Sequence, residues 1–167
     1  MSDLKTFLKR IRRVIWSPDL ILAALIALTT AILCPSVISI SMAKDFYGVG
    51  ISVLSIVFSI FFAALAIVMS AGDNEFITFL HKEGAYTEIV WNFRFAVMIL
   101  FTSLIVTLAE YVYAGFRFSH KAEWHSKWFL VIFFFCFSYS LLAVCLAILD
   151  AIKYSSNRVK FLNSKMH

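Results

Sequence analysis

The stretch GVGISVLSIVFSIFFAALAIVMS, residues Gly48–Ser70, contains no charged side chain and is long enough to cross a bilayer as a helix. A hydrocarbon core of roughly 30 Å requires about 20 apolar residues in helical form. Three other stretches share this character, and the predicted spans are Asp19–Met42, Gly48–Ser70, Phe95–Ala114 and Trp128–Lys153. The sequence therefore predicts an all-α fold, a four-helix transmembrane bundle over residues 17–154.

The composition also indicates a membrane protein. Hydrophobic residues make up 62% of the chain, charged residues 15%, and the mean hydropathy is +0.88. The net charge of +5 could suggest nucleic acid, but the basic residues flank the apolar stretches, as they do beside anionic lipid headgroups. We therefore expect the lipid bilayer as a partner and no direct contact with nucleic acid. Cys34, Cys136 and Cys145 all lie in apolar stretches without a CxxC pair, which is typical of buried hydrophobic residues.

Residues 1–16 have the pattern of a basic amphipathic helix on a membrane surface. Apolar residues recur at helical spacing, and the basic residues predicted to bind the surface are Lys5, Lys9, Arg10, Arg12 and Arg13. Ser41-Met42-Ala43 resembles a signal-peptide cleavage site. However, the apolar run before it exceeds the roughly 7–15 residues of a secretory signal, so we expect this span to be retained.

The links between spans are short. Ser17 and Pro18 predict a capped helix start, and Pro35 predicts a kink within the first span. The stretch Ala43–Tyr47 is the predicted turn between spans one and two. Residues 75–94 are amphipathic and predict a cytoplasmic helical extension that Gly84 interrupts. Residues 155–167 form a basic cytoplasmic tail.

Basic residues predict the orientation. With both termini in the cytoplasm, eleven of the 15 Lys and Arg residues lie inside, and only Lys44, Arg117, Lys121 and Lys127 lie outside. Cytoplasmic loops carry such an excess of basic residues. Trp16 and Trp91 would then mark the inner interface, and the outer interface would carry Trp124 and Trp128.

The sharpest pattern is a stripe of small residues on span two, at intervals of three and four: Gly48, Ser52, Ser55, Ser59, Ala63, Ala66 and Ser70. Small residues let membrane helices approach closely, and Ser can hydrogen-bond across helices. Similar faces occur on the other spans, one of them through Ser140. Two interpretations stay open: packing within one bundle, or a subunit interface or weakly polar pore lining after oligomerisation. The candidate packing or pore-lining residues are Ser52, Ser55, Ser59, Ala63, Glu110 and Ser140.

Two carboxylates lie at membrane depth, where charge is costly and a partner is expected. Asp150 is expected to pair with Lys153 and Arg94, and Glu110 with Tyr111, Tyr113 or an outer-loop lysine. His120, Glu123 and His125 lack a metal-site spacing and predict a solvated loop. We expect no metal and no cofactor. Because no catalytic motif occurs, we also expect the chain not to be an enzyme.

The stretch Ser52–Ile105, about a third of the chain, resembles a known class. The span SVLSIVFSIFFAALAIVMS is followed by the link AGDNEFITFLHKEGAYTEIVWNFRFA and a further span. This order is similar to small multi-span membrane proteins of bacterial anti-phage systems: retrons, cyclic-nucleotide signalling systems and Kiwa. The resemblance implies the bacterial inner membrane and antiviral defence. It also implies either an effector that disturbs the membrane or an infection sensor with a cytoplasmic partner.

Two classes of function follow. The chain is expected to be an effector that forms homo-oligomers and disrupts the inner membrane on infection. The alternative is a sensor or scaffold that recruits a cytoplasmic protein from the same operon, or an accessory subunit of a transport complex.

Overall fold

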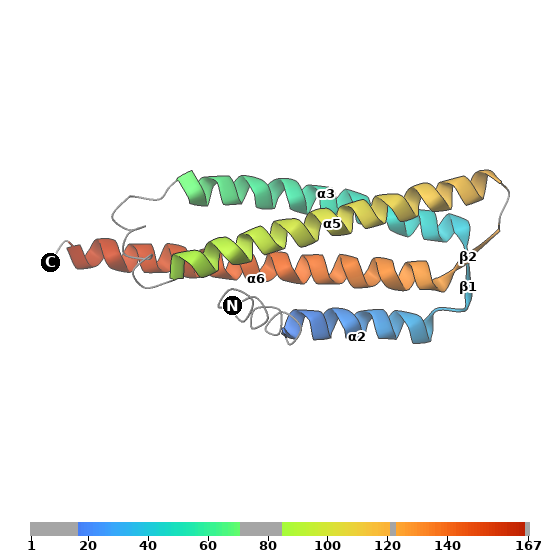
Figure 1. The fold of residues 1–167 in the computed structure, drawn as a ribbon, viewed down its shortest axis with the longest axis horizontal. Coiled ribbons are helices and arrows are strands. Elements are labelled where there is room, and N and C mark those ends of the chain that lie inside the picture. Colours follow the sequence, from blue (N-terminus) through green and yellow to red (C-terminus); the bar gives the residue numbers. More distant parts are fainter. Residues whose placement is uncertain (1–16, 71–84, 121–122, 166–167) are drawn as a thin grey trace, which may run out of the picture.

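The computed structural model describes residues 17–70, 85–120 and 123–165, which form four helices and two very short strands. The helices run along one long axis, with α2 on one side of α6 and with α3 and α5 on the other (Figure 1). The helical fold class is confirmed, whereas the strands were not predicted. In chain order the elements are α2 (Pro18–Leu33), β1 (Val37–Ser39), α3 (Ile40–Ser70), α5 (Ala85–Ser119), β2 (Trp124–Ser126) and α6 (Lys127–Lys165).

Three of the helices are long and apolar enough to cross a membrane: Ile40–Ala63 in α3, Trp91–Ser119 in α5 and Lys127–Lys153 in α6. These contain most of predicted spans two to four. The fourth helix, α2, has 16 residues. At 1.5 Å per residue it is about 24 Å long, shorter than a typical hydrocarbon core. The predicted surface helix, residues 1–16, lies outside the described residues.

Predicted span one does not form a single helix. The prediction of a continuous, kinked helix over Asp19–Met42 is wrong, because α2 ends at Leu33, directly before Cys34 and Pro35. Proline lacks the backbone N–H for the next helical bond, and it disfavours helical geometry in the preceding residue. Cys34 accordingly has an extended backbone, with φ −78° and ψ 137°. The start of α2 is as predicted, because Ser17 caps it by accepting a hydrogen bond from the Leu20 N–H at 3.4 Å.

The turn between the first two helices also differs from the prediction. Residues 43–47 lie inside α3, which begins at Ile40, and the chain reverses at residues 34–39 instead. Lys44 and Asp45 suggested a polar loop, but their neighbours Ala43 and Tyr47 are fully buried in the bundle. Burial of these two side chains favours a continuous helix from Ile40 onward. The break between the helices lies at Pro35, after the end of α2 and before the start of α3.

The two strands join the two connections at one end of the bundle, which we call the sheet end. β1 and β2 are antiparallel, with Ile38 opposite His125. The Ile40 N–H donates to the Glu123 carbonyl at 3.2 Å, and Lys127 Nζ donates to the Ala31 carbonyl at 3.0 Å. These bonds satisfy backbone groups that would otherwise be left unpaired between helices. The sheet end is therefore a fixed cap and not a loose pair of loops.

Side chains fill the bundle in two clusters. The cluster at the sheet end is centred on Tyr47 and Phe133, and the second is centred on Leu54 and Leu100. Gly50 of α3 lies against the ring of Phe133 from α6, because a Cβ on Gly50 would be 2.6 Å from Phe133 Cζ. The absence of a side chain at Gly50 thus lets α3 and α6 approach at this level.

Candidate functional site

The small-residue stripe of α3 lies on the outside of the bundle. Ser52, Ser59 and Ala63 are exposed, and Ser55 is half-buried. The buried positions Tyr47, Leu54 and Phe61 lie on the opposite side of the helix, where they contact α5 and α6. We call the residues Gly48, Ser52, Ser55, Ser59 and Ala63 the α3 stripe. Its side chains are available for contact with lipid or with another helix.

Two of the three hydroxyl groups of the α3 stripe, those of Ser52 and Ser59, bond within their own helix. Ser52 Oγ donates to the Gly48 carbonyl at 3.0 Å, and Ser59 Oγ donates to the Ser55 carbonyl at 2.9 Å. Such bonds back to the residue four positions earlier satisfy the donor without a partner helix. These two donors therefore tolerate an apolar environment.

A hollow of about 630 Å³ extends this surface toward the sheet end. It is bordered by Gly48 and Ser52 of the stripe, by Lys44 and Asp45, and by Tyr111 of α5. The Lys44 ammonium lies 4.8 Å from the ring centre of Phe118, so α5 holds it at the rim. The hollow is thus lined by the small residues of the stripe, by apolar side chains and by two adjacent side chains of opposite charge.

Small residues on the other helices face inward. Ala23 and Ala27 of α2 are buried, as are Ser140 and Ala143 of α6, and these two helices pack together. Ser140 Oγ donates to the Phe137 carbonyl at 2.8 Å. The structure therefore separates candidates that looked equivalent in sequence, because Ser140 lies inside the bundle and the α3 stripe lies outside it.

Glu110 of α5 is also inside the bundle, with only 7% of its surface exposed. Within the described residues its Oε2 atom has no hydrogen-bond partner, and the same holds for the buried Oγ of Ser103, two turns earlier. None of the expected partners, Tyr111, Tyr113 or an outer-loop lysine, forms a described bond with it. Because Glu110 is buried and lies on α5, it is separate from the exposed α3 stripe.

His125 of β2 is buried, contrary to the prediction that it lies in a solvated loop. Its exposure is 2%, and its Nε2 atom is 3.0 Å from the hydroxyl of Tyr47 in α3. Strand pairing places the imidazole against Tyr47, Tyr113 and Phe129. His120 is exposed, as expected. No local signal predicts this contact, because Tyr47 and His125 are 78 residues apart.

The environment of His125 predicts a pH dependence of stability. Burial, together with the nearby Arg117 guanidinium, lowers the pKa of His125 from its ordinary value of 6.5. Below pH 6.5 the unfolded chain binds this proton more strongly than the folded chain does. The free energy of unfolding therefore keeps its full value, as far as His125 is concerned, above pH 6.5. Below pH 6.5 it declines by up to about 1.4 kcal/mol per pH unit, until the pH reaches the pKa of His125 in the folded chain.

Thermal unfolding in detergent at pH 8, 6 and 5 measures this effect. We expect the melting temperature to fall between pH 6.5 and 5 in the native chain and to change less in His125→Gln. An identical pH profile for the two proteins would show that His125 does not control the stability of the sheet end.

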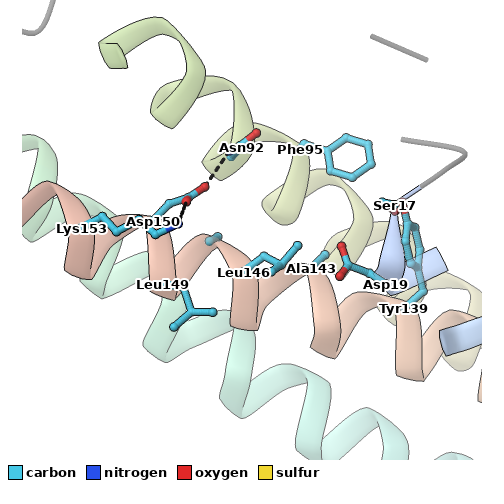
Figure 2. Close-up of a pocket in the computed structure, with 11 residues that line it drawn as sticks. Ser17, Asp19, Asn92, Phe95, Tyr139, Ala143, Leu146, Leu149, Asp150 and Lys153 are labelled. Carbon is cyan, nitrogen blue, oxygen red and sulfur yellow. Dashed lines mark hydrogen bonds and ion pairs between the residues drawn. The ribbon is translucent and has the colours of Figure 1, made fainter. Parts of the chain in front are cut away.

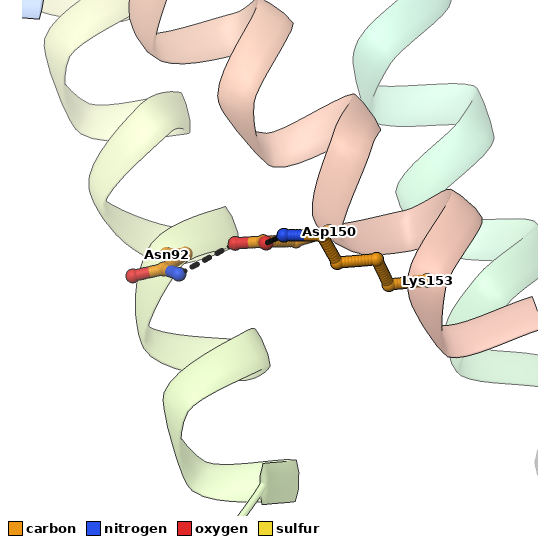
Figure 3. Close-up of polar contacts among 3 residues, drawn as sticks. All are labelled: Asn92, Asp150 and Lys153. Atoms are coloured by element: carbon orange, nitrogen blue, oxygen red, sulfur yellow. Dashed lines mark hydrogen bonds and ion pairs between the residues drawn. The ribbon is translucent and has the colours of Figure 1, made fainter. Parts of the chain in front are cut away.

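At the other end of the bundle, Asp150 of α6 borders a cavity between the helices (Figure 2). Asn92 Nδ2 of α5 donates to Asp150 Oδ2 at 2.7 Å, and Lys153 Nζ lies 3.8 Å from Asp150 Oδ1 (Figure 3). The predicted pair with Lys153 is confirmed. No described bond joins Asp150 to Arg94, and the α5 side chain that bonds to Asp150 is that of Asn92 instead.

Several expectations remain outside these observations. Lys5, Lys9, Arg10, Arg12 and Arg13 precede the first described residue. Among the described ranges, no group of three or more His, Cys, Asp or Glu residues could hold a metal ion. Comparison with known proteins finds no matching family model, no matching curated protein and no matching solved structure.

Proposed function

We propose that this chain is a membrane-embedded component of bacterial antiviral defence, which self-associates in the inner membrane and disrupts its integrity on infection. The observation that carries the proposal is the position of the α3 stripe on the outside of the bundle. Without a hydrophobic driving force between helices in lipid, close packing of small residues is a main source of association. The resemblance described above supplies the biological setting.

The second copy of the chain docks along the hollow beside the stripe. In a two-fold arrangement the same patch contacts itself, so each contact occurs twice. Asp45 of one copy then faces Lys44 of the other, and Gly48 and Ser52 of the two copies meet one and two turns further along α3. The adjacent opposite charges at the rim support this pairing over one with an unrelated apolar surface.

Two features support disruption of the bilayer. Joined copies would place the Ser side chains of α3 along their contact, which makes that zone more polar than lipid. In addition, α2 is about 6 Å shorter than a hydrocarbon core of roughly 30 Å. A short helix is accommodated by local thinning of the bilayer. Two copies together would thin the membrane over a larger area than one.

In the proposed orientation both termini are cytoplasmic and the sheet end faces outward. The distribution of basic residues supports this orientation, and residues 1–16 would bind anionic lipid through Lys5, Lys9, Arg10, Arg12 and Arg13. Reporter fusions after Glu123 and after His167 test it. An external signal at His167 or a cytoplasmic signal at Glu123 would contradict it.

One observation favours the alternative of a sensor or scaffold. The apolar part of α6 ends at Lys153, whereas the helix continues to Lys165. This extension carries Arg158, Lys160 and Lys165 beyond the span, where a cytoplasmic protein could bind. An accessory role in a transport complex would use the same kind of contact.

Expression of the chain alone in a bacterial host, with a potential-sensitive dye, separates the two functions. We expect an effector to collapse the membrane potential and stop growth. Normal growth and unchanged potential, at equal amounts of inserted protein, would contradict the effector proposal and favour the sensor. A companion variant with Lys9, Arg10, Arg12 and Arg13 changed to Gln distinguishes toxicity of the basic segment from toxicity of the bundle.

A further inference from the structure

The interior of the bundle is polar in one half. Besides tyrosines, the buried polar side chains among the described residues are Ser103, Thr107, Glu110, His125, Ser138 and Ser140. All of them lie in the half next to the sheet end, where α5 ends and α6 begins. Ser103, the deepest of them on α5, is about 24 Å of helix from the end of α5. Glu110 is the one carboxyl group in this set.

The Glu110 carboxyl lacks a partner that could offset a negative charge. Its Oε2 atom forms no hydrogen bond, and the ion pair described within the bundle joins Asp150 and Lys153 instead. Residues 1–16 and 71–84 adjoin the ends of α2 and α3 that are remote from the sheet end. Residues 121–122 follow the end of α5, which is about 14 Å of helix beyond Glu110. An ionised carboxylate without a partner is expensive at membrane depth, whereas a neutral carboxylic acid is not.

The neighbouring titratable groups cannot supply a positive charge. Tyr47 of α3 and Cys136 of α6 are close enough to be affected by a charge on Glu110. A phenol or a thiol is either neutral or negative, so neither can neutralise a carboxylate. Of the nearby cations, Lys44 lies over the rings of Tyr111 and Phe118, and Arg117 acts on His125.

A polar route leads from the level of Glu110 to the sheet end. The Tyr47 hydroxyl is 3.0 Å from Nε2 of His125. Tyr113, one turn after Glu110, also lies beside the imidazole, with the ring centres 6.1 Å apart. A hydroxyl and a neutral imidazole can each accept and donate a proton. His125 itself lies between the exposed residues Trp124 and Ser126, so this route ends close to solvent.

No such route leads in the opposite direction through the described residues. Beyond Ser103 the interior is filled by an apolar cluster whose members are at most 4% exposed, among them Leu54, Phe61, Phe93, Leu100 and Val144. The next described polar contact, between Asn92 and Asp150, lies past this cluster. An apolar barrier therefore separates Glu110 from the end of the bundle that is remote from the sheet.

We propose that Glu110 is a proton-binding site that exchanges protons with the solution at the sheet end and not with the solution at the opposite end. In the bundle described here the site is filled and the acid is neutral. Loss of the proton leaves an unpartnered carboxylate between α3, α5 and α6. The packing of these helices thus responds to acidity on one side of the membrane. This holds independently of self-association, because Glu110 is buried on α5 and takes no part in the α3 stripe.

A hydrophobic carbodiimide tests whether the buried acid is protonated. The acid proton moves to one nitrogen of the reagent, the carboxyl oxygen bonds to its central carbon, and the adduct rearranges to a stable N-acylurea. In the native full chain in vesicles at neutral pH, we expect dicyclohexylcarbodiimide to modify Glu110, as mapped by peptide mass spectrometry. Glu123, an exposed acid beside β2, is the matched control and should react preferentially with a water-soluble carbodiimide. An unmodified Glu110, or one that reacts equally with the water-soluble reagent, would overturn the proposal.

Infrared spectroscopy checks the same point without a reagent. The difference spectrum between the native chain and Glu110→Gln should contain the C=O stretch of a neutral carboxylic acid. Carboxylate bands in its place would show that Glu110 is ionised, and they would overturn the proposal.

Oriented vesicles with a pH difference across the membrane test the one-sided exchange. Raising the pH at the sheet end should slow modification of Glu110 several-fold, and raising it at the opposite end should have no effect. Tyr47→Phe keeps the ring in place but removes the hydroxyl. This variant should respond more slowly to a pH jump and reach the same final extent of modification. An equal response to the pH on both sides would overturn the one-sided site.

Discussion

Replacement of Gly50 by alanine is expected to destabilise the bundle, whereas the same replacement at Gly48 is expected to be tolerated. A Cβ at position 50 would lie 2.6 Å from Phe133 Cζ, but at position 48 the nearest atom is Tyr111 Cε2 at 3.7 Å. Phe133 cannot swing away easily, because the rings of Tyr47 and Phe137 pack against it. Such overpacking costs about 1–3 kcal/mol.

The paired design removes the effect of helix propensity. Both changes replace glycine by alanine inside α3, so both gain the same roughly 1 kcal/mol of helix preference. The difference between the two free energies of unfolding therefore reports the clash alone. Unfolding by SDS in mixed micelles, followed by circular dichroism, measures it. Adding Phe133→Leu should restore part of the loss at Gly50→Ala. Equal stability of the two alanine variants would show that α3 and α6 do not meet as described.

The second large effect is expected from bulky residues on the α3 stripe. Ser52→Leu with Ser59→Leu should lower the association constant in membranes by about tenfold or more. A tenfold loss corresponds to about 1.4 kcal/mol of lost packing between the helices. The fold of one copy should persist, because both side chains are exposed and their hydroxyls bond only to α3. Under the proposed function, cells that express this variant should keep more of their membrane potential than cells that express the native chain.

Thr102 provides the matched control for this change. It is an exposed residue of α5 whose hydroxyl also donates to its own helix, to the Met98 carbonyl at 2.8 Å. Thr102→Leu therefore adds the same kind of bulk to a different face and should leave association unchanged. If Thr102→Leu weakens association as much as the double change does, added bulk anywhere matters and the α3 stripe is not the interface.

The apolar stretches could be predicted from sequence because their length and lack of charge are local properties. The outcome at Pro35 could not. A proline in a span ends or kinks the helix, and which occurs depends on what the following residues pair with. Here Val37–Ser39 pair with Trp124–Ser126, a contact between distant parts of the chain. The same pairing buries His125, which explains why its loop prediction was wrong.

Sequence patterns also could not predict that the α3 stripe faces out of the bundle. In a soluble helix, a polar face points to water, but lipid is as apolar as the interior of a bundle. Leu54 and Phe61 on one side, and Ile56 and Ile60 on the other, are therefore equally suited to burial by hydrophobicity. Their exposures nevertheless differ widely, at 0% and 3% against 60% and 66%. The fit of Gly50 to Phe133 helps to decide which side faces inward.

Disulfide crosslinking in native membranes tests self-association along the α3 stripe most directly. In a chain with Cys34, Cys136 and Cys145 changed to Ala, Ser59→Cys should give a covalent dimer on mild oxidation. Thr102→Cys, placed on α5, should remain monomeric at the same expression level. Absence of a dimer from Ser59→Cys, or equal dimer from both positions, would contradict the account.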